Sequence, residues 1–126
     1  MGYIRHHALV VTSWSGERLI AVHDAANLLA RANPNLAGLV SPVMTSATNG
    51  HLSFFVAPDG SKEGWPLSDE GDALRAAIVA ECERSRGEDG DAYVEWVEVQ
   101  YGDDDGETII VGHSDERRWR ARRVKS

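Results

Sequence analysis

The order of hydrophobic patterns along the chain constrains the fold more than any other feature of the sequence. Runs of β-branched and aromatic residues predict strands, and apolar stripes at a helical spacing predict helices. The predicted strands are Tyr3–Trp14, Leu39–Ser46, Leu52–Ala57, Tyr93–Tyr101 and Thr108–Val111, and the predicted helices run from Ser15 to about Ala32 and from Ser68 to near Gly87. This order predicts an α+β domain, a ferredoxin-like βαββαβ plait with an extra C-terminal strand, in which two helices cover one face of an antiparallel sheet.

Two of the predicted strands are apolar on both of their faces. Ala8 to Val11 and Phe54 to Val56 carry apolar side chains at successive positions, which predicts interior strands with little solvent exposure. The plait places its first and third strands at the centre of the sheet, so composition and topology agree. Pro42, in contrast, predicts that the second strand lies at an edge. Asn49-Gly50 predicts a hairpin turn between the second and third strands.

The two predicted helices each have an apolar stripe and a candidate N-cap. In the first helix Ser15 is the expected cap, and in the second helix Ser68 is the expected cap. The stripe of the first helix consists of Leu19, Val22, Ala26 and Leu29, widened by Ile20 and Ala25. The stripe of the second consists of Leu74, Ile78 and Cys82, backed by Ala77. We therefore expect Cys82 to lie in the core.

Composition favours a folded protein without a membrane segment. The chain has 126 residues, of which 42% are hydrophobic, enough for a single domain over residues 1–114. An apolar run of about 20 residues is absent, as is a signal-peptide pattern, so a cytoplasmic protein is expected. The single cysteine excludes an internal disulfide and a cysteine-based zinc site. We expect neither a cofactor nor a metal.

Charge divides the chain into an acidic body and a basic C-terminal tail, residues 115–126. The net charge is −7, but the tail holds six of the 13 basic residues, which leaves seven basic and 18 acidic residues in the body. The tail is predicted to contact an acidic surface: its own body, a partner subunit or nucleic acid. The candidate contact residues are Arg117, Arg118, Trp119, Arg120, Arg122 and Arg123. Nucleic acid is the weaker alternative, because the acidic body repels a duplex.

The segment Pro58–Trp65 is a candidate ligand loop between a strand and a helix. Two interpretations apply to Asp59, Ser61, Lys62 and Trp65. The favoured one is a tight turn with a solvated lysine and a tryptophan folded over the edge of the core. The alternative is a ligand loop with free N–H groups, a cationic lysine and a stacking tryptophan. The spacing of a phosphate-binding loop is absent.

His6 and His7 are adjacent in the first predicted strand. Adjacent strand residues face opposite ways, so the pair cannot chelate one metal ion. A half-buried polar histidine is the favoured interpretation, and a proton carrier or ligand is the alternative. His51 and His113 lie at strand ends, from which they could approach this pair. The run Asp103-Asp104-Asp105-Gly106-Glu107 lacks the alternation of a calcium loop and predicts a solvated turn.

Several segments together resemble a known group of proteins. GYIRHHALVVTSW, SFFVAPDGSKEGW followed by SDEGD, and EWVEVQYGDDDGE resemble small uncharacterised accessory proteins of actinobacterial phages, from Gly2 to about Glu107. That group has no established activity, so it assigns no functional residues. The resemblance implies an accessory role in a host cell: binding a host protein, or sequestering a small molecule used in defence.

These observations lead to one hypothesis and two alternatives. The hypothesis is a non-catalytic binding protein that contacts a host protein through an acidic surface, the open sheet face and the Pro58–Trp65 loop, and that could form a homodimer. The first alternative is a nucleotide-type ligand sponge or small enzyme, with Lys62, Trp65 and one of His6 or His7 in its pocket. The second alternative is nucleic-acid contact through the basic tail.

Overall fold

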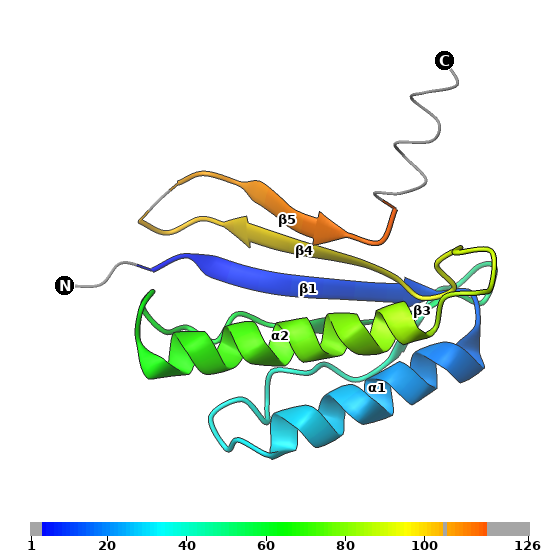
Figure 1. Ribbon diagram of the computed structural model, residues 1–126, viewed down its shortest axis with the longest axis horizontal. Coiled ribbons are helices and arrows are strands. Elements are labelled where there is room, and N and C mark those ends of the chain that lie inside the picture. The colour runs from blue at the N-terminus through cyan, green and yellow to red at the C-terminus, as the bar shows by residue number, and fades with distance from the viewer. Residues whose placement is uncertain (1–3, 105, 116–126) are drawn as a thin grey trace.

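Five strands form one antiparallel sheet in the computed structural model, and two helices lie on one of its faces (Figure 1). The structure describes residues 4–104 and 106–115. The elements are β1 (His6–Ser13), α1 (Gly16–Arg31), β2 (Met44–Thr45), β3 (Leu52–Val56), α2 (Pro66–Arg84), β4 (Glu95–Tyr101) and β5 (Ile109–His113). The strand order is β2-β3-β1-β4-β5, and neighbouring strands are antiparallel. The predicted α+β class is confirmed.

The two strands predicted to be interior do lie side by side within the sheet. β1 pairs with β3 on one side and with β4 on the other, and Leu9 is the register partner of Val56. The prediction of little solvent exposure was wrong, because Val10 is 41% exposed and Phe55 is 40% exposed. The helices cover only one face of the sheet, so every second side chain of these strands points away from the core.

The core lies between the sheet and the two helices. Leu9 and Val11 of β1 and Phe54 and Val56 of β3 are buried there. From the helices the core receives Leu19, Val22, Ala26, Ala30, Leu74, Ile78 and Cys82. Burial of one large apolar side chain contributes about 1.5–3 kcal/mol, so this layer supplies most of the driving force for folding. The predicted burial of Cys82 is confirmed.

The apolar stripe predicted for α1 includes two residues that do not face the core and omits one that does. Leu29 is 40% exposed and Ile20 is 47% exposed, whereas Ala30 is fully buried. At about 3.6 residues per turn, eleven residues complete three turns, so Ala30 returns beneath Leu19 whereas Leu29 does not. The core-facing stripe therefore ends on a small side chain, and Leu29 faces outward.

The helix starts were predicted correctly for α1 and incorrectly for α2. Ser15 is the N-cap of α1, and its Oγ accepts a hydrogen bond from the backbone N–H of Arg18 at 3.4 Å. α2 begins two residues before the expected cap, at Pro66, and Ser68 is buried within its first turn. Proline suits the first helical position, because its φ is already helical and its missing N–H would have no partner there. α2 ends at Arg84, before the predicted Gly87.

The edges of the sheet are short. The predicted strand Leu39–Ser46 is reduced to β2, with one isolated bridge from Val40 to Val56. The predicted hairpin turn is confirmed: Asn49 and Gly50, with φ values of 61° and 65°, lie in the loop that a hydrogen bond from the Ser46 N–H to the His51 carbonyl closes. β5 pairs with β4 as the predicted C-terminal hairpin. Within the described ranges, neither helix has the length and apolarity needed to cross a membrane.

Candidate functional site

Every strand contributes an apolar side chain to the open face, which is the face of the sheet opposite to the helices. Val10 is the register partner of both Phe55 and Val97, so these three side chains form a row across the central strands. Met44 and Ile110 lie diagonally to this row on the two edge strands, as the register partners of Ser53 and Val99, and they are 51% and 60% exposed. We call these five residues the apolar band. A contiguous exposed apolar surface of this kind marks an interaction site more often than scattered apolar residues do.

A hollow of about 660 Å³ opens where the apolar band crosses β4 and β5. Its apolar side chains are three residues of the band. The lining residues are Val10, Thr12, Glu95, Trp96, Val97, Ile110, His113, Ser114 and Asp115. The hollow is large enough for an aromatic side chain of a partner, and residues of β1 and β4 line it.

Contacts on the helix side of the sheet hold the strands that carry the hollow in place. The indole N–H of Trp96 donates a hydrogen bond to Oε2 of Glu83 at 3.1 Å. The Trp96 ring lies so close to Gly112 that a Cβ at this position would sit 3.2 Å from Cη2 of the ring. Ser114 accepts a hydrogen bond from the backbone N–H of Trp96 at 2.9 Å, and its carbonyl accepts one from Nη2 of Arg86 at 2.8 Å. The end of β5 is therefore fixed to the rest of the fold.

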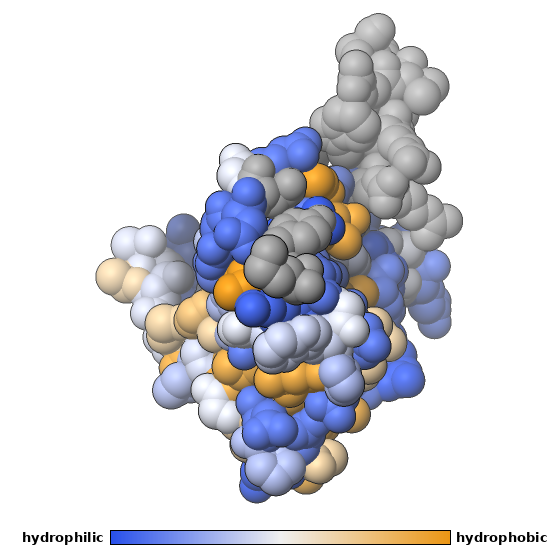
Figure 2. Space-filling model, turned by 90° about the vertical axis from the view of Figure 1, so that its left-hand side faces the viewer, coloured by the Kyte–Doolittle hydropathy of each residue, from blue (hydrophilic) through white to orange (hydrophobic). Residues whose placement is uncertain are grey.

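Acidic side chains lie at both ends of the open face. Glu95 and Asp115 lie on the rim of the hollow, whose described lining includes no lysine or arginine. Asp103 and Asp104 are exposed in the turn between β4 and β5, at the opposite end. Figure 2 looks onto that end, and hydrophilic residues gather toward its top, with hydrophobic patches below them. The open face thus combines an apolar centre with acidic ends.

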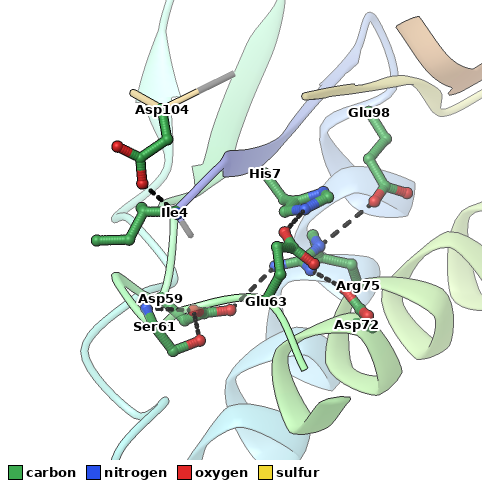
Figure 3. Close-up of polar contacts among 9 residues, drawn as sticks. All are labelled: Ile4, His7, Asp59, Ser61, Glu63, Asp72, Arg75, Glu98 and Asp104. Carbon is green, nitrogen blue, oxygen red and sulfur yellow. Dashed lines mark hydrogen bonds and ion pairs between the residues drawn. The ribbon is translucent and has the colours of Figure 1, made fainter. Parts of the chain in front are cut away.

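A second polar feature, the Arg75 cluster, lies on the helix side of the sheet (Figure 3). Arg75 is 2% exposed, and its guanidinium group contacts carboxylates from three segments of the chain. Nη1 lies 3.6 Å from Oδ2 of Asp59, Nε lies 3.3 Å from Oε2 of Glu98, and Nη2 pairs with Asp72. A buried guanidinium is tolerated only where such partners replace its hydration.

The Arg75 cluster anchors the 58–65 loop. Asp59 pairs with Arg75 and also accepts a hydrogen bond from the backbone N–H of Ser61 at 2.8 Å. In the same loop, Oε1 of Glu63 accepts a hydrogen bond from Nε2 of His7 at 2.7 Å. Asp59, Ser61 and His7 therefore have partners within the chain. Gln100, which is 9% exposed, has a side-chain N–H group without a partner among the described residues.

The structure separates the six residues predicted to bind a ligand. His6 and His7 face opposite sides of the sheet, as predicted: His6 lies 5.3 Å from the Tyr101 ring and 3.5 Å from Asp103, away from Glu63. Lys62 lies 5.3 Å from the Trp65 ring, which is 51% exposed and does not fold over the core edge. The six residues therefore do not converge on one pocket.

The other predicted candidates lie elsewhere or outside the described residues. His51 precedes β3 next to the end of β1 that is remote from His6, and His113 pairs with Val97. Among the residues described, no cluster of three histidine, cysteine, aspartate or glutamate side chains could hold a metal ion. The predicted tail contacts, Arg117, Arg118, Trp119, Arg120, Arg122 and Arg123, lie outside the described residues.

The sequence pattern predicts an open sheet face, but it does not predict that apolar side chains are exposed on that face. The signal was available: strands that are apolar on both faces occur together with only two helices, which can cover only one face of the sheet. No pattern in the sequence indicates that Arg75 is buried.

Comparison with protein-family models, curated proteins and solved structures finds no match.

Proposed function

We propose that this protein is a non-catalytic binding protein and that the apolar band on the open face is its contact surface. The observation that carries the proposal is that all five strands contribute an apolar side chain to the same face of the sheet. Exposing Val10 and Phe55 in the middle of a sheet gives up about 25 cal/mol for each Å² of apolar surface left in water. A bound partner would recover this free energy.

The charges around the band favour a partner of particular chemistry. Glu95 and Asp115 lie at one end of the open face, and Asp103 and Asp104 lie at the other. The complementary surface is an apolar patch flanked by lysine or arginine residues. Charges at the rim of an interface accelerate encounter and select the partner, while the desolvated apolar centre provides most of the affinity.

We further propose that the architecture is a ferredoxin-like βαββαβ plait with an extra C-terminal strand. Support comes from the order of the first four strands, which reads β4-β1-β3-β2 from one side, with α1 and α2 as the crossover helices. In this arrangement both helices pack on one face, which leaves the other face free for contact. The fifth strand widens that free face and supplies Ile110 and one wall of the hollow.

The resemblance to accessory proteins of actinobacterial phages supports a host protein as the partner. An accessory protein that acts by occupying a host surface needs a binding face but no catalytic groups. The arrangement of the predicted ligand residues agrees with this view, because Asp59, Ser61 and His7 already have partners within the chain.

Site-specific photocrosslinking in actinobacterial host cells tests the proposal. A photoreactive amino acid replaces Phe55 on the open face, and the matched control replaces Leu28, an exposed side chain of α1 that is 68% exposed. We expect one discrete adduct from position 55 that is absent from position 28 and disappears when Val10→Lys is added. Equal adducts from both positions, or an adduct that survives Val10→Lys, would contradict the proposal.

A further inference from the structure

We infer that the C-terminal segment 116–126 of the same chain docks into the hollow, with Trp119 as its anchor. The inference rests on the proposed function at one point: a docked segment would compete with a partner for part of the open face. The docking itself is an intramolecular contact that can be tested without any partner.

The hollow suits an aromatic side chain that is flanked by positively charged residues. Val10, Val97 and Ile110 provide apolar contact. Carboxylates of Glu95 and Asp115 stand at the rim, with no lysine or arginine among the described lining residues to balance them. An indole buries a large apolar area, and guanidinium groups next to it would pair with the two carboxylates.

The chain itself contains a segment with this chemistry at a short distance along the sequence. Arg117, Arg118 and Arg120 flank Trp119, which follows Asp115 by four residues. Four residues span at most about 13–14 Å, and Asp115 already lines the hollow, so Trp119 is within reach of it. The charges also match, because the residues before Asp115 carry 18 acidic and seven basic groups.

Linkage within one chain favours this occupant over a second molecule. A short tether presents its segment at an effective concentration on the order of millimolar, far above the concentration of free chains in dilute solution. The docked segment would shield Ile110 and Val97 while leaving Phe55 and Met44 exposed. A partner that binds the whole apolar band must then displace the docked segment. The docked segment would therefore lower the apparent affinity of every such partner.

Fluorine NMR of the full chain labelled with 5-fluorotryptophan tests the inference. Trp119→Phe identifies the Trp119 resonance, and a synthetic peptide of residues 115–126 gives its undocked position. We expect the Trp119 resonance to lie away from the peptide position in the native chain and to return to it in Ile110→Lys. Val111→Lys is the matched control, because Val111 is 52% exposed on the same strand but does not line the hollow, and it should leave the resonance unshifted.

Two results would overturn the inference. A Trp119 resonance at the peptide position in the native chain would show that the segment is undocked. A resonance that moves with protein concentration would assign the occupant to a second copy. Neither result bears on the crosslinking at Phe55, which lies outside the hollow, so the two proposals can fail separately.

Discussion

Gly71 in α2 is the position at which the Arg75 cluster can be tested most sharply. An alanine Cβ at Gly71 would overlap Oδ2 of Asp59 and would lie 3.1 Å from its Cγ and 3.3 Å from Nη1 of Arg75. Asp59 is not free to swing away, because its side chain is 8% exposed and is held by Arg75 and Ser61. Gly71→Ala should therefore displace Asp59 from Arg75.

Two opposing contributions set the expected change in stability. Alanine is favoured over glycine inside a helix by about 1 kcal/mol. Loss of one partner from a buried ion pair destabilises by about 3–5 kcal/mol, and the lower end applies here because Asp72 and Glu98 still contact Arg75. The net loss should be about 2 kcal/mol, which corresponds to a fall in Tm on the order of 5–10 °C for a chain of this size.

Urea unfolding followed by circular dichroism measures this change. Gly38→Ala is the matched control, because a Cβ at Gly38 meets no atom within 4 Å, and we expect it to be neutral or slightly stabilising. In a background with Asp59→Ala the overlap disappears, so Gly71→Ala should become stabilising by its helix propensity. A Gly71→Ala protein as stable as the native one would refute the close packing of Asp59 against α2.

Two further predictions concern the core and the open face. Burial raises the pKa of Cys82 from 9.0 to about 12, so the thiol should resist thiol reagents at pH 8 until the protein unfolds. Its contribution to stability should be complete below pH 9 and lost as the pH rises toward 12, a dependence that urea titrations of Cys82→Ala should lack. Phe54→Ala, at a fully buried position, should destabilise by about 3–5 kcal/mol, and Phe55→Ala by about 1 kcal/mol. Similar losses in urea unfolding at the two positions would mean that the open face is covered.

Local patterns in the sequence predicted the elements of the fold because their causes are local. The Asn49-Gly50 turn, the Ser15 cap and the Leu74, Ile78, Cys82 stripe each depend on residues within one or two turns of chain. The misplaced start of α2 also has a local cause, since Pro66 competes with Ser68 for the beginning of the helix and its fixed φ prevails. Errors of this kind shift an element by a few residues without changing the topology.

The Arg75 cluster could not be predicted, because its members are distant in sequence. Arg75 follows Leu74 in α2, and nothing in the helix pattern separates it from a solvated arginine. Its partners Asp59 and Glu98 come from the 58–65 loop and β4, which meet only after the sheet has formed. The same limit explains why Asp59 and Ser61 resembled ligand residues: short polar side chains in a loop look alike whether they face solvent or a buried arginine.

The two faces of the sheet invert the usual distribution of charge and apolar surface. On the helix side Arg75 is 2% exposed, while on the open side Phe55 is 40% exposed. Each arrangement contributes less to the stability of the fold than the usual one would. A buried ion cluster often stabilises no more than apolar packing does, and an exposed phenylalanine contributes little to folding. The Arg75 cluster has an architectural reason, since it ties the 58–65 loop and α2 to β4. Among the described residues the apolar band has no such partner, which is why contact with a further surface is its most economical explanation.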